Sequence, residues 1–223
     1  MVEKQQIKSK KRVSDYGEVF TAEREVKAMC DLVKDETERI ESRFLEPACG
    51  NGNFLAEVLE RKLNVVKKRY GKSPSDYERY SVLAITSIYG VDIMEDNAQE
   101  CRERLFQIWD QAYTKVLKNE SNDRCRNAVQ FILKKNIVCG DALTLKQQDD
   151  SPIIFAEWSL VSGNKIKRRD FRFDELLSGH DQQPDLFMSS EWEYDEEIDA
   201  LMPAPVNSCL LYTSPSPRDP KTS

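Results

Sequence analysis

Apolar residues recur at helical spacing in three long segments of the chain. Residues 22–38 carry a sparse apolar stripe, residues 53–70 carry a denser one, and residues 95–117 repeat the dense pattern. Spacing of three and four residues places such side chains on one face of a helix. We therefore predict amphipathic helices over these ranges, each with one face packed on a core.

Shorter apolar runs alternate with these helices and predict strands. They are "RFLEPA" (43–48), "SVLAITSIYGVDI" (81–93, whose start also allows a helix), "NIVCGDAL" (136–143) and "PIIFAEW" (152–158). Continuous apolar runs are typical of strands buried on both faces. The alternation over residues 21–158 predicts a mostly parallel sheet with right-handed crossovers, in a three-layer α/β/α fold.

Glycine, proline and serine mark the connections between these elements. "GKSPSDY" (71–77) is interpreted as a surface insertion, and "NESNDRC" (119–125) as a polar loop. Residues 159–173 are expected to form a hairpin that turns at residues 162–164, followed by a short helix over 173–177.

The composition suits one soluble globular domain. The chain has 223 residues, of which 39% are hydrophobic and 32% are charged. No apolar run approaches the roughly 20 residues of a membrane span, and the polar N-terminus lacks a secretory signal, so a cytoplasmic location without membrane contact is expected. The cysteines form no C-x-x-C pair and His180 is the only histidine, so we expect no metal site and no Ser-His-Asp hydrolysis.

Charge is unevenly distributed on a chain of net charge −6. Residues 1–16 form a basic arm that we expect to be flexible, and residues 178–208 form an acidic tail that we expect to be disordered. A basic strip in the hairpin is a candidate for DNA phosphate contacts, although such a run is also typical of a solvated face. The strip comprises Lys165, Lys167, Arg168, Arg169 and Arg172.

The C-terminal residues 209–223 are excluded from the fold prediction. "CLLYTSPSPRD" (209–219) resembles the translation of a transposase adapter used in sequencing libraries. The alternative is a natural tail rich in proline and serine. The natural sequence is therefore expected to end near Ser208, and residues 17–177 are expected to form the folded domain.

A glycine turn follows the first predicted strand in "EPACGNGNF" (46–54). It lacks the Lys-Ser/Thr of a phosphate-binding loop, and Leu55 stands where a dinucleotide fingerprint has its third glycine. The Glu46 carboxylate would repel a phosphate and attract an ammonium group. Ligands of an open parallel sheet bind beyond the carboxyl ends of its strands, where Asp92 and Asp141 also stand.

These segments together resemble the N6-adenine DNA methyltransferases of restriction-modification systems. "EPACGNGNF" resembles motif I, "GEVFT" (17–21) the amino-terminal cofactor motif of the γ-type enzymes with Ala22 in place of the usual proline, "YGVDI" motif II and "CGDAL" motif III. The resemblance implies a Rossmann-like fold that binds S-adenosylmethionine. The implied cofactor-binding residues are Phe20, Thr21, Glu46, Pro47, Ala48, Cys49, Gly50, Gly52, Phe54, Asp92, Ile93, Asp141, Ala142 and Leu143.

The resemblance also implies a role for the motif residues. Asp92 would accept hydrogen bonds from both ribose hydroxyls and Ile93 would pack on the adenine. Asp141 would accept from the adenine amino group, beside Leu143.

The catalytic [D/N]-P-P-[Y/F] motif of the family is absent from the sequence. Family members flip the target base and hold its amino group with that motif. At the expected place stand Glu157 and Trp158, weak candidates for accepting from the amino group and stacking on the base. The favoured alternative is that Glu157 pairs with a nearby arginine and Trp158 packs in the core.

The sequence therefore leaves competing hypotheses. The first is an S-adenosylmethionine-dependent DNA (adenine-N6) methyltransferase or modification subunit, active alone or with a second methyltransferase or specificity subunit. The second is a non-catalytic cofactor-binding or degenerate subunit that acts through a partner protein. A third, methylation of RNA or protein, is less favoured by the motifs.

Overall fold

A computed structural model describes residues 8–16, 18–161, 165–174, 192–195, 200–203 and 210–212. Gly17, the hairpin turn at 162–164 and His180 lie outside these ranges, as does most of the predicted helix 173–177. The helices are α1 (Lys10–Tyr16), α2 (Glu23–Leu32), α3 (Lys34–Thr37), α4 (Asn53–Tyr70), α5 (Pro74–Thr86), α6 (Glu95–Leu117) and α7 (Asp123–Asn136). The strands are β1 (Phe44–Glu46), β2 (Ile88–Asp92), β3 (Ile137–Cys139), β4 (Ile154–Leu160), β5 (Lys165–Arg172), β6 (Trp192–Asp195), β7 (Ala200–Pro203) and β8 (Leu210–Tyr212).

The densest helical stripes predict their helices well. Helices α4 and α6 occupy the predicted ranges 53–70 and 95–117. The predicted helix 22–38 is instead divided at Val33, whose φ of −119° and ψ of 35° are not helical. Its sparse apolar stripe gave no signal for this break.

The structure differs from the predicted connections in two places, residues 71–77 and residues 119–125. The segment 71–77 is not only a surface insertion, because α5 begins at Pro74 and buries Tyr77 completely. The run 81–93 is divided between the end of α5 and strand β2, so its start is helical, as the sequence allowed. Helix α7 was not predicted; it begins where the Asn122 side chain caps the backbone N–H of Cys125 at 2.8 Å.

Strands β1, β2 and β3 form a parallel sheet in that order. Phe44 pairs with Ile88 at one end, and Asp92 pairs with Cys139 at the other. The parallel sheet and the mixed α/β class are as predicted. Since the strands are parallel, the carboxyl ends of all three lie at one edge, where the glycine turn begins.

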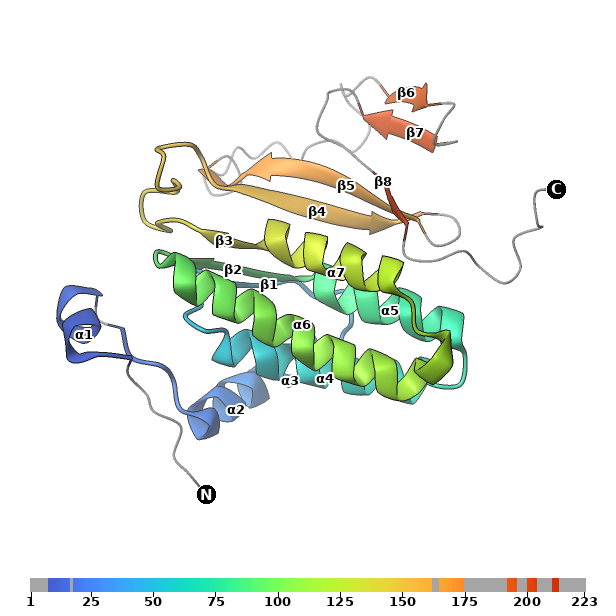
Figure 1. Ribbon diagram of the computed structural model, residues 1–223, viewed down its shortest axis with the longest axis horizontal. Coiled ribbons are helices and arrows are strands. Elements are labelled where there is room, and N and C mark those ends of the chain that lie inside the picture. The colour runs from blue at the N-terminus through green and yellow to red at the C-terminus, as the bar shows by residue number, and fades with distance from the viewer. Residues whose placement is uncertain are drawn as a thin grey trace.

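Helices and strands cover opposite faces of this sheet. Ile88 belongs to the core formed with the helices, whereas Tyr89 and Val91 pack with Phe155 and Phe173 from beyond the sheet. Figure 1 shows α4 and α6 on one side of the sheet and the β4–β5 hairpin on the other. Among the described residues, the expected second helix layer is therefore replaced by an antiparallel hairpin.

Strand β4 runs from the carboxyl edge of the sheet toward the amino edge. Its start lies beside Gly140, next to the end of β3, where Ile153 would be 2.8 Å from a Cβ at that glycine. Further along, Trp158 bonds to Asn136, which directly precedes β3. Residues 140–153 contain no helix that returns the chain to the amino edge, so β4 does not extend the parallel sheet.

The C-terminal part adds short strands that the sequence did not predict. Strands β6 and β7 pair antiparallel within the expected acidic tail, and β8 pairs with β5 from within residues 209–223. The proposed domain boundaries stay predictions.

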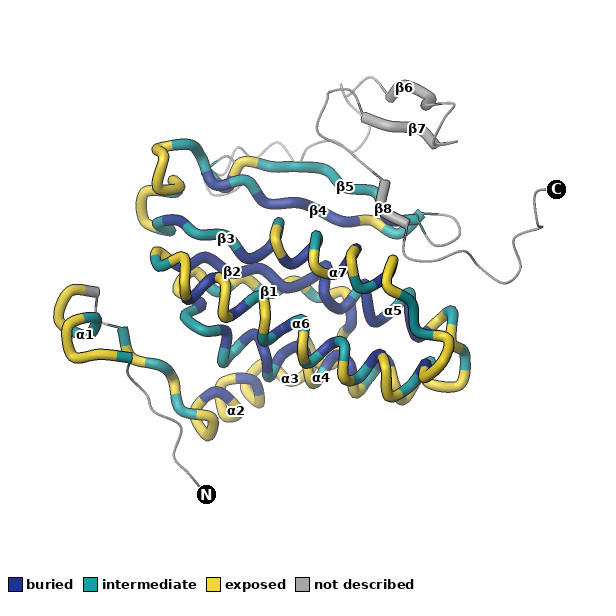
Figure 2. The backbone as a smooth tube through the Cα atoms, in the orientation of Figure 1, coloured by how far each residue is buried: buried dark blue, intermediate teal, exposed yellow. Residues whose placement is uncertain are grey.

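The core lies between the helices and the sheet. Figure 2 shows that β2 is buried throughout, whereas buried residues alternate with exposed ones along α4 and α6. Trp109 stacks on Tyr113 with ring centroids 4.4 Å apart, and both side chains are fully buried. No helix in the described ranges is long and apolar enough to cross a membrane.

Candidate functional site

The glycine turn adopts the backbone conformation that its glycines permit. Gly50 has a φ of 51° and Gly52 a φ of 79°, in the left-handed region that side chains disfavour. A Cβ at Gly52 would lie 2.6 Å from Cys101 Sγ. Both conformation and close packing therefore require glycine at this position.

Asp92 ties the glycine turn to the end of β2. Its Oδ2 accepts from the backbone N–H of Gly50 at 2.8 Å, and its Oδ1 accepts from Met94 N at 2.9 Å and Asn97 Nδ2 at 3.1 Å. The side chain is only 8% exposed. A carboxylate offers about four acceptor positions, so roughly one remains, on Oδ2.

Glu46 carries the least satisfied carboxyl group at this edge of the sheet. Its Oε2 is buried and has no hydrogen-bond partner. Burial, with a smaller contribution from the Asp92 carboxylate, raises the pKa of Glu46 to about 8. A buried carboxyl group without a partner is suited to a cationic ligand.

The segment before α2 packs on the glycine turn. Two ring carbons of Phe20 would lie 3.2 Å from a Cβ at Gly50. The Thr21 carbonyl accepts from Asn53 Nδ2 at 3.0 Å, which fastens this segment to the start of α4. The structure thus brings together the two segments that the sequence analysis assigned to one cofactor site.

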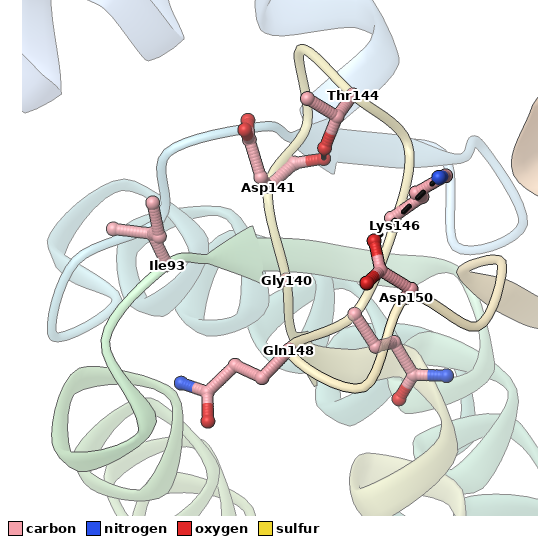
Figure 3. Close-up of a pocket in the computed structure, with 8 residues that line it drawn as sticks. Ile93, Gly140, Asp141, Thr144, Lys146, Gln148 and Asp150 are labelled. Atoms are coloured by element: carbon pink, nitrogen blue, oxygen red, sulfur yellow. Dashed lines mark hydrogen bonds and ion pairs between the residues drawn. The ribbon is translucent and has the colours of Figure 1, made fainter.

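A pocket opens beside the ends of β2 and β3. It has a volume of about 310 Å³, and Ile93 and Asp141 are among the residues that line it. Figure 3 shows these two side chains approaching from separate loops, with Lys146 and Asp150 paired on the far wall. The Asp141 carboxylate accepts from the backbone N–H of Leu143 at 2.8 Å. Ile93 is 47% exposed and Leu143 is 94% exposed, so both apolar side chains remain accessible.

The other predicted cofactor residues have different surroundings. Pro47 and Ala48 are exposed at the mouth of the turn, whereas Cys49 is buried and its N–H donates to the Val91 carbonyl at 2.8 Å. Phe54 packs on the Phe44 ring, and Ala142 packs against the buried cluster that contains Tyr89 and Val91. Cys49, Phe54 and Ala142 therefore also support the site through packing.

The sequence analysis missed polar residues that brace the turn. Arg104 of α6 donates to the side-chain oxygens of Asn51 and Asn53, the first at 3.4 Å. Asn97, 2% exposed, donates to Asp92. Asn97 had one sequence signal for this role, its position about one helical turn after motif II. Arg104 had none, because its partners lie more than 50 residues away in the sequence.

Glu157 and Trp158 lie away from the glycine turn. Glu157 pairs with Arg43, which precedes β1 at the amino edge of the sheet. Trp158 is 6% exposed, its Nε1 donates to Asn136 Oδ1 at 2.8 Å, and its ring packs edge-on against Phe131. These contacts are the ion pairing and core packing that the sequence analysis gave as the alternative to a catalytic role.

The candidate DNA-contact residues alternate along β5. Arg168 pairs with Asp170 and lies over the Phe131 ring, and Arg172 pairs with Asp174. Lys165, Lys167 and Arg169 occupy the alternate positions of the strand. Burial, followed by the neighbouring Arg169 charge, lowers the pKa of Lys167. Part of the strip thus serves intramolecular pairing.

The described residues contain no cluster of three or more histidine, cysteine or acidic side chains that is suited to a metal ion. The five cysteines within those ranges are free, and four of them are buried.

Comparison with known proteins identifies the family. A family described as "MmeI, DNA-methyltransferase domain" matches residues 20–163, more than half of the chain. The chain therefore belongs to this DNA-methyltransferase domain family. It is 27% identical over 126 residues to DNA methyltransferase A of Bacillus subtilis (strain 168), which covers 55% of this chain and 14% of that protein. No solved structure matches the chain.

Proposed function

We propose that this chain is the S-adenosylmethionine-binding part of a DNA (adenine-N6) methyltransferase or modification subunit of a restriction-modification system. The observation that carries the proposal is the unpartnered carboxyl group of Glu46 beside a positive-φ glycine turn. Membership of a DNA-methyltransferase domain family supports DNA as the substrate class.

The residues at the carboxyl edge suit the separate parts of this cofactor. Glu46 would face the ammonium and sulfonium charges across the glycine turn. The open acceptor position on Asp92 would accept a hydrogen bond from one ribose hydroxyl. The resemblance implies hydrogen bonds from both ribose hydroxyls, so this role is smaller than the implied one. Asp141 would accept from the adenine amino group between Ile93 and Leu143, which line or flank the pocket.

When bound, S-adenosylmethionine supplies an electrophilic methyl group. The chain would hold the charged end through Glu46 and keep the Gly50 N–H engaged with Asp92. Phe20 would cover the turn and exclude water from it. In this proposal the described residues bind and orient the cofactor, and the group that accepts a hydrogen bond from the amino group of the target adenine in DNA comes from elsewhere.

A second candidate function is a non-catalytic cofactor-binding or degenerate subunit that acts through a partner protein. The position of Glu157 and Trp158 at the amino edge favours it, because β4 brings no acceptor and no aromatic ring to the glycine turn. The candidate DNA contacts Lys165, Lys167 and Arg169 would then position DNA for the partner.

A methyl-transfer assay with two readouts tests the proposal. The purified chain is incubated with methyl-labelled S-adenosylmethionine and mixed duplex DNA, alone and with the product of a neighbouring modification gene, and N6-methyladenine is measured after DNA hydrolysis. Cofactor binding with transfer only in the presence of the partner supports a module of a split enzyme. Binding without transfer in either reaction favours the non-catalytic subunit, and absence of binding contradicts both.

A further inference from the structure

The described part of the basic arm, residues 8–16, and the residues 18–20 that follow Gly17 together form an N-terminal arm that docks on the start of α6. Lys8 Nζ lies 2.6 Å from Glu100 Oε1 and 3.1 Å from Asp96 Oδ2. Arg12 donates to both carboxylate oxygens of Asp96, from Nη1 to Oδ2 at 2.5 Å and from Nη2 to Oδ1 at 3.1 Å. Paired contacts of this kind fix orientation as well as distance, so the arm has a defined place on α6.

The same arm reaches the buried polar groups behind the cofactor site. Arg12 also donates to Glu18, from Nη2 to Oε1 at 2.8 Å. Glu18 Oε1 accepts from Asn97 Nδ2 at 2.6 Å, and the same Nδ2 donates to Asp92 Oδ1. The side chains of Glu18 and Asn97 lie almost out of solvent. A continuous chain of hydrogen bonds therefore joins Arg12 to Asp92.

Asn97 is held from both ends by the arm. Its Oδ1 accepts from Lys8 Nζ at 2.8 Å, while its Nδ2 bonds Glu18 and Asp92. The bond from Lys8 fixes which end of the amide faces Asp92, because an ammonium group only donates. With the arm docked, Asp92 Oδ1 is thus occupied and Oδ2 is left toward the glycine turn.

The arm also places an aromatic ring against the glycine turn. Phe20 follows Glu18 by two residues, and its ring lies against Gly50. Lys8 Nζ stands 6.0 Å from the centre of that ring. Release of the arm would therefore remove Phe20 from Gly50 and free the amide of Asn97.

The docking contacts are suited to a reversible equilibrium. Asp96 is 50% exposed and Glu100 is 47% exposed, and ion pairs open to solvent are individually weak and sensitive to salt. Arg12, followed by Lys8, holds the pKa of Asp96 well below its usual range, so Asp96 stays ionised and available to the arm.

We propose that docking of the N-terminal arm on α6 and cofactor binding are coupled, with Asn97 as the positioning residue between them. The inference rests on the proposed function, because the arm acts on the proposed cofactor site through Asn97 and Phe20. Such coupling is reciprocal. Docking of the arm raises the affinity for the cofactor by the same factor by which the bound cofactor raises the equilibrium constant for docking of the arm.

Four proteins test the coupling by calorimetric titration with S-adenosylmethionine at 50 mM salt. They are Arg12→Gln, Asp96→Asn, the double variant, and Lys11→Gln as a matched control that removes one exposed charge from the same helix. We expect each single variant to raise the Kd at least about fivefold, within the range typical of coupled sites. The double variant should lose less affinity than the product of the two single effects, because both substitutions remove the shared contact between Arg12 and Asp96. The control should bind like the wild type.

A second measurement follows the arm directly. Trypsin cleavage at Lys8 to Arg12 is timed in the wild type and in Asp96→Asn, whose arm sequence is unchanged, with and without saturating S-adenosylmethionine. We expect faster cleavage in Asp96→Asn than in the wild type. In the wild type the cofactor should slow cleavage by the same factor by which Asp96→Asn raises the Kd for the cofactor. A merely structural contact would change cleavage without this match.

Each outcome decides the proposal. If the wild type binds and the variants bind equally well, with unchanged melting temperatures, arm docking and the cofactor site are independent and the inference is wrong. If the wild type does not bind S-adenosylmethionine, the proposed function itself fails, and the coupling falls with it. If the wild type no longer binds the cofactor more tightly than the variants at 500 mM salt, the ionic origin of the coupling is supported.

Discussion

Replacement of Glu46 by glutamine should stabilise the free protein at alkaline pH while weakening cofactor binding. The pKa of Glu46 is raised from an ordinary 4.5 to about 8 by burial and by Asp92. Between these values the folded protein binds a proton that the unfolded chain has released, so the free energy of unfolding falls as pH rises from about 4.5 to about 8.

The size of this effect follows from the raised pKa. The interval of about 3.5 pH units corresponds to an upper limit of about 5 kcal/mol at 1.36 kcal/mol per unit. Because water and side-chain relaxation moderate such penalties, we expect Glu46→Gln to exceed the wild type by about 1–3 kcal/mol at pH 8.5 and by little at pH 5.

Urea unfolding at pH 5, 7 and 8.5 measures the difference, with Glu120→Gln as the control. Glu120 is exposed on the short turn after α6, so its removal should change stability by less than about 0.5 kcal/mol at every pH. A wild type whose stability relative to Glu46→Gln does not fall between pH 5 and 8.5 would refute the assignment of a buried, unpaired carboxyl group to this position.

The same carboxyl group predicts how pH affects binding. If Glu46 is neutral in the free protein below about pH 8 and ionised against a cationic ligand, binding releases a proton. The affinity for S-adenosylmethionine should therefore rise with pH up to about 8. Calorimetry at pH 7 in buffers of different ionisation enthalpy measures this release, and a binding enthalpy that is independent of the buffer would contradict it.

Three further predictions concern single side chains. Gly52→Ala should lower the free energy of unfolding by about 1–3 kcal/mol in urea titration, because its φ is 79° and its Cβ would clash with Cys101 Sγ at 2.6 Å; wild-type stability would contradict the turn geometry. Lys62→Met should destabilise by about 2–4 kcal/mol, since it removes the donor to the Ile40 and Ser42 carbonyls and to Ser87 Oγ; thermal and urea unfolding check this. Trp158→Phe should cost about 1–2 kcal/mol through the lost bond to Asn136 and leave the Kd for S-adenosylmethionine unchanged, whereas a large loss of affinity would return Trp158 to the cofactor site.

The sequence predicts best those elements whose local signals agree. Helices α4 and α6 combine dense apolar spacing with a glycine turn or a strand before them, and their bounds match. Helix α7 has a similar apolar stripe at Ala128, Val129 and Ile132, but the polar segment before it favoured a loop. Its start depends on a cap by Asn122, which is a weak signal without knowledge of the fold.

The candidate site was predictable as far as it depends on strand ends. A parallel sheet gathers the residues that follow its strands, so Glu46, Asp92 and Asp141 had to meet at one edge. The direction of β4 was not predictable, because alternation of strands suggested a parallel strand and only packing against Tyr89 and Asn136 reverses it. Likewise, the link from Arg12 to Asp96 spans 84 residues and leaves no local pattern.

Equilibrium binding of S-adenosylmethionine to the purified chain tests the central claim most directly. We predict one cofactor per chain for the wild type and loss of at least about tenfold in affinity for Asp92→Ala, which removes the acceptor of the Gly50 N–H and frees the turn. Asp35→Asn, at an exposed position of α3, should leave the affinity unchanged. Absence of binding, or equal affinity of Asp92→Ala and the wild type, would contradict the claim that this glycine turn holds the cofactor.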